Sequence, residues 1–197
     1  MKYCLLCTQP LRQSITWRIL LKKSFPKVIC ERCTQKFERA ENVEGSDDQS
    51  LFTYNEAMKD YLHQYKFLQD VALANVFSED IHHSLSSQKG VIVPIPMHPE
   101  KKRERTFAHI DELLSAANIP FIHLLKKTST TTQSSKTLQE RLTTAPLFQI
   151  MPSTKVEAKT YILVDDIRTT GTTLQHAKKV LIEHGANCVK TFTLIKG

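Results

Sequence analysis

The segment Y-I-L-V-D-D-I-R-T-T-G-T-T, which runs from Tyr161 to Thr173, carries the most specific pattern in the chain. Its apolar first half predicts a buried strand, and the adjacent carboxylates of Asp165 and Asp166 come where that strand ends. A turn rich in threonine follows, and the spacing of apolar residues then predicts a helix over 174–184. Loop amides and the helix dipole both attract negative charge, so this pattern predicts an anion-binding loop.

Two carboxylates would repel a bare phosphate, so the ligand should also carry hydroxyl groups or arrive with Mg²⁺. Ribose hydroxyls and a 5-phosphate together describe phosphoribosyl diphosphate. The segment resembles the signature of the type I phosphoribosyltransferases, in which two acidic residues precede a T-T-G-x-T loop. The resemblance implies that Asp165 and Asp166 hold the ribose hydroxyls, directly or with Mg²⁺. The loop positions to which it assigns the 5-phosphate are Thr169, Thr170, Gly171, Thr172 and Thr173. A buried strand with a polar turn is the alternative.

Four of the five cysteines form two C-x-x-C pairs near the amino terminus. The first pair is Cys4 and Cys7, and the second is Cys30 and Cys33. Four thiolates on two tight turns suit tetrahedral Zn²⁺ in a structural site, which leaves no coordination position for a catalytic water. A redox dithiol would not require two pairs, and disulfides would require export. We therefore expect a zinc finger over residues 1–40 whose folding depends on the metal.

Length and charge narrow the class of protein. The 197 residues fit one α/β domain and a small satellite, and 27 basic against 20 acidic residues give a formal net charge of +7. This surplus suits a nucleic acid, a polyphosphate ligand or an anionic membrane surface, and it selects none of them. The sequence shows neither a transmembrane apolar run nor a signal peptide, which together with thiolate metal ligands predicts a cytoplasmic protein.

Residues 38–50 contain few large apolar side chains and are interpreted as a linker to a second domain over 51–197. In that domain, strands alternate with helices, which predicts a mostly parallel sheet covered on both faces. The expected helices span 55–65, 70–85, 106–117 and 174–184, the expected strands 90–96, 121–125, 161–164 and 189–195, and a polar loop 129–135. Because ligands bind beyond the carboxyl ends of parallel strands, the ends after Val93 and Val164 should face one crevice.

A basic run follows the strand expected over 90–96. It contains Lys101, Lys102, Arg103 and Arg105. A solvated start of a helix is the simplest interpretation of such a run. At a strand end it could instead hold the diphosphate of the ligand, since guanidinium groups match phosphate oxygens, and Arg105 is the best candidate. Lys101, Lys102 and Arg103 suit a nucleic-acid backbone equally well.

Features across nearly the whole chain resemble the ComF competence proteins, which join a four-cysteine finger to a phosphoribosyltransferase-like domain. Besides the cysteines and residues 165–173, the shared positions are Tyr65, Lys66, Pro94, Pro96, Arg105, Phe107, Thr130, Gln133 and Arg141. The chain departs from the family pattern at three positions. Thr106 stands where glycine is usual, and Ala108 and His109 replace an Asn-Gln pair.

The resemblance implies a role in natural transformation, in which incoming single-stranded DNA crosses the cytoplasmic membrane. Such a protein would act at the inner face of that membrane, with peripheral association in the absence of a transmembrane segment. It would bind single-stranded DNA, phosphoribosyl diphosphate with Mg²⁺, and other DNA-uptake proteins. Single-strand binding requires a basic groove with aromatic platforms, for which Tyr65, Lys66 and Phe67 are candidates. The alternative is a phosphoribosyltransferase that acts on an unidentified acceptor.

Overall fold

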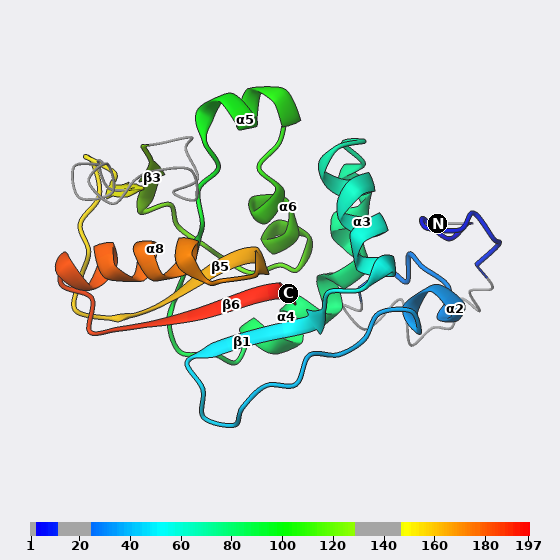
Figure 1. Cartoon of the computed structure of the whole chain (residues 1–197), viewed down its shortest axis with the longest axis horizontal. Coiled ribbons are helices and arrows are strands. Elements are labelled where there is room, and N and C mark those ends of the chain that lie inside the picture. Colours follow the sequence, from blue (N-terminus) through cyan, green and yellow to red (C-terminus); the bar gives the residue numbers. More distant parts are fainter. Residues whose placement is uncertain (1–2, 12–24, 129–146) are drawn as a thin grey trace.

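A four-stranded parallel sheet forms the centre of the structure, a computed structural model that describes residues 3–11, 25–128 and 147–197 (Figure 1). Its strand order is β1-β6-β5-β2. The strands span Asp48–Thr53 (β1), Val91–Pro94 (β2), Thr160–Arg168 (β5) and Cys188–Lys196 (β6). Because all neighbouring strands run parallel, their carboxyl ends lie at one edge, and the expected parallel sheet is confirmed.

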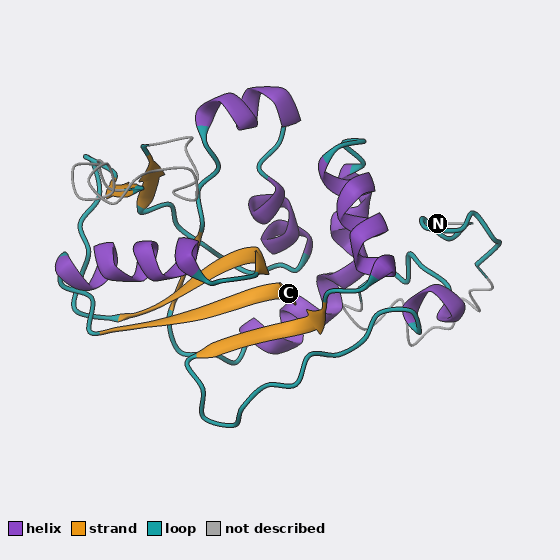
Figure 2. Ribbon diagram, in the orientation of Figure 1, coloured by secondary structure: helices purple, strands orange, loops and turns teal. Residues whose placement is uncertain are grey.

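Helices cover both faces of this sheet, as the alternation of strands and helices predicts (Figure 2). The described helices are α2 (Glu31–Thr34), α3 (Glu56–Lys66), the 3-10 helix η1 (Val71–Phe77), α4 (Ser78–Leu85), α5 (Pro99–Arg105), α6 (His109–Ala116) and α8 (Thr172–Glu183). Along β5, Ile162 and Val164 pack with α3, α4 and α6, whereas Tyr161 and Leu163 pack with α8. Burial on both faces explains why this strand is continuously apolar.

The register of the sheet places the ends of β2 and β5 side by side. Pro94 pairs with Val164, and the next amide, that of Ile95, donates to the carbonyl of Val164 at 2.8 Å. Pro94 ends β2 as its missing N–H predicts. The two strand ends therefore border the same region, as expected from the sequence.

Two expected helices differ from the structure. Residues 70–85 do not form one helix, because η1 gives way to α4 at Ser78, whose hydroxyl donates to the Asn75 carbonyl at 3.0 Å. Such local side-chain bonds compete with the α-helical ladder. The helix expected over 106–117 begins only at His109. Thr106 instead ends α5 in a left-handed conformation, with φ of 63°.

Two expectations about strands and linkers were also wrong. Only Leu125 of the segment 121–125 lies in a strand, β3 (Leu125–Lys127), which pairs antiparallel with the unexpected β4 (Phe148–Ile150) outside the main sheet. The segment 38–50 includes the start of β1, and Ala40 donates to the carbonyl of Leu51 in that strand. The start of β1 was not predicted because this edge strand contains few apolar residues. The loop expected over 129–135, with Thr130, Gln133 and Arg141, lies outside the described residues.

A cluster of aromatic rings joins the segment after the cysteines to the helices. Phe77 of η1 lies at its centre, with ring centroids 4.9 Å from Phe37, 4.8 Å from Phe52 and 4.8 Å from Tyr61. These rings meet edge to face or at a tilt, the arrangements that the ring quadrupole favours. The cluster therefore connects the segment after α2 with β1, α3 and η1 in one core.

Replacing Phe77 with alanine should lower the free energy of unfolding by ~3–5 kcal/mol, since it opens a cavity in this core. Urea denaturation followed by circular dichroism measures the change. Phe67→Ala is the matched control: its ring is 63% exposed, so its free energy of unfolding should change by less than ~0.5 kcal/mol. Equal destabilisation by the two substitutions would contradict the central place of Phe77.

Candidate functional site

The two carboxylates of the phosphoribosyl signature lie at the carboxyl end of β5, and the structure gives them different surroundings. Asp166 continues the face of Ile162 and Val164 and is buried beneath α3 and α6, whereas Asp165 is half-buried. One Asp165 oxygen accepts the backbone N–H of Asp166 at 2.9 Å. The other Asp165 oxygen has no hydrogen-bond partner among the described residues, so Asp165 is the carboxylate available to a ligand.

Asp166 is held by two side chains from other elements. Lys66, the last residue of α3, forms an ion pair with Asp166 Oδ2, and both side chains are almost buried. His109, the first residue of α6, has its Nε2 3.1 Å from the same oxygen. Burial lowers the pKa of His109 well below its usual 6.5, and the charges of Lys66 and Arg105 lower it further. His109 is therefore neutral beside Asp166, and neither its Nδ1 nor Asp166 Oδ2 has a hydrogen-bond partner among the described residues.

Burial also shifts the pKa values of the charged groups in this cluster. It raises the pKa of Asp165 to about 7, although the charges of Lys66 and Lys127 oppose the rise. Burial lowers the pKa of Lys66 to about 8, with opposition from Asp165 and reinforcement from Arg105 and Lys101. Such perturbed groups are typical of binding and catalytic sites, where charge is kept out of water.

The threonine loop joins these carboxylates to α8, as predicted. Gly171 precedes the helix with φ of 74°, a conformation that glycine adopts without steric cost. The hydroxyls of Thr170 and Thr172 lie 2.9 Å apart, and Thr169, Thr170 and Thr172 are exposed. An exposed loop at the N-terminus of a helix is well suited to an anion.

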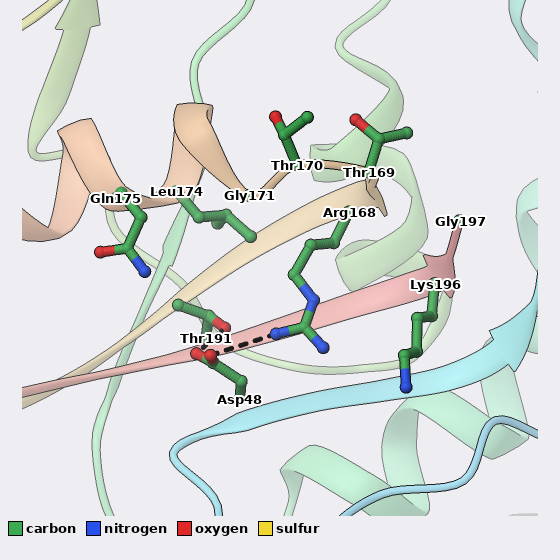
Figure 3. A pocket seen from close by; sticks show the side chains of 10 residues that line it. All are labelled: Asp48, Arg168, Thr169, Thr170, Gly171, Leu174, Gln175, Thr191, Lys196 and Gly197. Carbon is green, nitrogen blue, oxygen red and sulfur yellow. Dashed lines mark hydrogen bonds and ion pairs between the residues drawn. The ribbon is translucent and has the colours of Figure 1, made fainter.

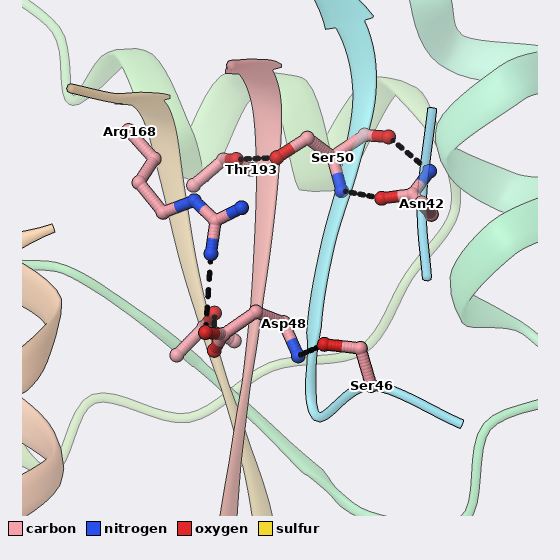
Figure 4. Close-up of polar contacts among 7 residues, drawn as sticks. Asn42, Ser46, Asp48, Ser50, Arg168 and Thr193 are labelled. Atoms are coloured by element: carbon pink, nitrogen blue, oxygen red, sulfur yellow. Dashed lines mark hydrogen bonds and ion pairs between the residues drawn. The ribbon is translucent and has the colours of Figure 1, made fainter. Parts of the chain in front are cut away.

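Arg168 ties the start of this loop to the far edge of the sheet. Its side chain crosses β6 and places Nη1 3.1 Å from Asp48 Oδ2 on β1 (Figure 3). Asp48 in turn accepts the hydroxyl of Thr191 at 2.7 Å, and a buried Ser50–Thr193 hydroxyl pair continues this polar row (Figure 4). A cavity of about 270 Å³ lies beside Arg168, and neither Asp165 nor Asp166 lines it. The cavity is thus separate from the carboxylates.

The basic run forms α5, which is attached to the end of α3. Lys101, Lys102 and Arg103 are exposed, whereas Arg105 is half-buried and its guanidinium lies 5.4 Å from the centroid of the Phe67 ring. Arg105 and Lys101 lower the pKa of Lys66 through their charge. The Gln69 side chain, just beyond α3, donates to the Glu104 carbonyl of α5 at 3.0 Å, so α5 lies beside the end of α3.

The two aromatic residues expected to form a platform for bases, Tyr65 and Phe67, have different surroundings. Tyr65 is buried, and its hydroxyl donates to the carbonyl of His109 at 2.6 Å. Its ring therefore belongs to the core, where no base can reach it. Phe67 is 63% exposed and remains a candidate. From the sequence, Lys66 was a candidate for binding nucleic acid, and His109 was a position that differs from the ComF family pattern. The sequence did not reveal that both side chains contact Asp166.

The four cysteines of the two C-x-x-C pairs converge, and their sulfur atoms lie within 4.8 Å of one another. Cys7 and Cys30 Sγ are 3.6 Å apart, close to the ~3.8 Å between two ligands of a tetrahedral site with Zn–S bonds of ~2.3 Å. The backbone N–H of Cys30 points at Cys4 Sγ at 3.4 Å. A hydrogen bond with the backbone of Gln9 lowers the pKa of Cys7 to about 6. The donor set is compatible with zinc.

None of the described helices is long and apolar enough to cross a membrane. The family model described as "Phosphoribosyl transferase domain" matches residues 104–197, and the expected type I phosphoribosyltransferase-like fold is confirmed. Adenine phosphoribosyltransferase from Leishmania tarentolae is similar over 80% of this chain and 94% of its own, with a TM-score of 0.45 and 10% identity.

Two curated proteins resemble the chain over nearly its full length. Competence protein ComFC of Streptococcus pneumoniae (strain ATCC BAA-255 / R6) is 34% identical, over 98% of this chain and 99% of that protein. Competence protein ComFC of Bacillus subtilis (strain 168) is 30% identical, over 98% of this chain and 94% of that protein. Both matches cover 98% of this chain, and the chain therefore belongs to the ComFC family of competence proteins.

Proposed function

We propose that this protein handles incoming single-stranded DNA during natural transformation, at the cytoplasmic face of the membrane, and binds phosphoribosyl diphosphate in the same domain. Membership of a competence family supports the process. The observation that carries the DNA assignment is the exposed Phe67 ring with Arg105 stacked over it, next to the cations of α5. A base can stack on the ring while the cations hold its phosphates.

The phosphoribosyl site is proposed at the carboxyl ends of β5 and β2. Asp165 and Asp166 would serve the ribose hydroxyls, directly or through Mg²⁺, and residues 169–173 the 5-phosphate. Arg105 and Lys101 would lie toward the diphosphate, whose charge they complement. The attachment of α5 to the end of α3, where Lys66 contacts Asp166, supports this arrangement.

The cysteine cluster is proposed to hold a structural Zn²⁺ in a finger over residues 1–40, followed by a phosphoribosyltransferase-like domain over 51–197. Cys4, Cys7, Cys30 and Cys33 would occupy all four tetrahedral positions. The finger would then offer a rigid surface to other DNA-uptake proteins.

A phosphoribosyltransferase that acts on an unidentified acceptor is the second candidate. The match of residues 104–197 to a phosphoribosyl transferase domain favours it. Release of pyrophosphate from phosphoribosyl diphosphate on addition of nucleobases would support transfer, and unchanged ligand would oppose it.

Phe67→Ala should weaken binding of a fluorescent oligonucleotide of about 16 deoxythymidines by ~5- to 100-fold, because one stacked base is lost. Fluorescence anisotropy at fixed salt measures the dissociation constant. Ile182→Ala, which removes a side chain that is 44% exposed on α8, should leave the dissociation constant unchanged. Equal binding by wild type and Phe67→Ala would exclude the platform.

The Asp165→Asn, Asp166→Asn double substitution should abolish binding of phosphoribosyl diphosphate with Mg²⁺, since both hydroxyl acceptors lose their charge. Isothermal titration calorimetry compares it with wild type and with Asp111→Asn, a half-buried carboxylate on α6. Circular dichroism establishes that each variant is folded. Wild-type affinity in the double variant would refute the assignment of the two carboxylates.

Replacing Cys30 and Cys33 with serine should remove one Zn²⁺ per chain and unfold the amino-terminal region, because two of four ligands are lost. Elemental analysis gives the zinc content, and limited proteolysis reports the folding of the finger. Cys188→Ser is the control, since Cys188 lies on β6 away from the four-cysteine cluster. Unchanged zinc in the double variant would rule out these ligands.

A further inference from the structure

The Lys66 ammonium lies where a cation would be expected to neutralise the two aspartates. We propose that Lys66 takes the place of a divalent metal at these carboxylates, so that the ribose 5-phosphate half of the ligand binds without Mg²⁺. The inference rests on the proposed phosphoribosyl site and deepens it. Mg²⁺ would then accompany only the diphosphate half of phosphoribosyl diphosphate.

The position of Lys66 is fixed by the elements around it. It is the last residue of α3, and the preceding residue, Tyr65, is buried and bonded to the His109 carbonyl. Just beyond it, the Gln69 side chain donates to the Glu104 carbonyl at 3.0 Å. The end of α3 is therefore attached to both α5 and α6. The side chain of Lys66 is only 13% exposed. If it moved away from Asp166, both buried charges would lose their partner.

A metal ion at this place would meet strong opposition. His109, Asp165 and Asp166 have ligand atoms within 4.8 Å of one another, which is the only other arrangement in the described residues, besides the cysteines, that could hold an ion. Asp166 Oδ2 already contacts Lys66 and His109. An ion bound there would lie against the Lys66 ammonium, and two like charges in contact repel strongly in a site shielded from water.

The groups that remain suit a diol. Asp165 keeps one oxygen without a hydrogen-bond partner among the described residues, and it can accept a hydrogen bond from a hydroxyl. The Lys66 ammonium has three donors and can donate to the oxygen of a hydroxyl. A pair of adjacent ribose hydroxyls can satisfy both groups at once, with the 5-phosphate at the α8 N-terminus.

Ribose 5-phosphate is the probe that tests this proposal, because it has the hydroxyls and the 5-phosphate but lacks the diphosphate. Calorimetric titrations of the full-length protein are made in Mg²⁺-free buffer without a chelator, so that the finger keeps its zinc, and again with Mg²⁺. The wild type should show the same affinity in both to within about threefold, well under the tenfold that corresponds to one lost interaction. This part of the experiment requires no variant.

Lys66→Met should bind the probe ~10- to 100-fold more weakly in Mg²⁺-free buffer, because a charged hydrogen-bond donor is lost, and Mg²⁺ should restore the affinity. Lys59→Met, which removes a lysine that is 56% exposed on the same helix, should behave as wild type. Rescue by metal separates a lost charge from a damaged fold. Equal weakening of Lys66→Met in both buffers would overturn the proposal.

The remaining outcomes distinguish this inference from the function on which it rests. Wild-type binding that requires Mg²⁺ would overturn the role of Lys66 and leave the phosphoribosyl site in place. Wild-type affinity of Lys66→Met in Mg²⁺-free buffer would have the same meaning. Absence of binding by the wild type in both buffers would overturn the phosphoribosyl site, and the inference with it.

Discussion

Burial of β5 on both faces is the constraint on which the rest of the structure depends. Successive side chains of β5 point into two different cores. Asp166 therefore follows Ile162 and Val164 on the face that α3, α4 and α6 cover. A carboxylate placed inside a core must find charge and hydrogen bonds there. Lys66, at the end of α3, supplies the opposite charge, and His109, at the start of α6, has its Nε2 3.1 Å from Asp166 Oδ2. The position of both helices is thus coupled to a single carboxylate.

The same logic separates the two aspartates that are adjacent in sequence. Asp165 keeps one oxygen without a hydrogen-bond partner among the described residues, whereas Asp166 has its Oδ2 in contact with Lys66 and His109. The loop that follows is held from a different direction, through Arg168 and Asp48 on β1. The site therefore depends on contacts among two strands, β5 and β1, and two helices, α3 and α6.

The sequence was sufficient where the pattern was local. The strand, carboxylates and glycine turn of residues 161–173 predicted the loop at α8, and paired cysteines predicted the cluster of four thiols. It failed where tertiary contacts decide. β1 has few apolar residues because part of its surface carries the polar row of Asp48 and Ser50. Lys66 and His109 meet Asp166 only in the folded chain, so no local pattern could reveal the pairing.

Thr106 restricts the backbone at the end of the basic helix α5. A β-branched residue at φ of 63° is sterically costly, whereas glycine would adopt it freely. Threonine also has far fewer alternative backbone conformations than glycine. The connection between α5 and α6 is therefore more rigid than it would be with glycine at this position. The orientation of α5 is therefore already restricted in the free protein. Binding of a ligand to its cations would cost little conformational entropy in this segment.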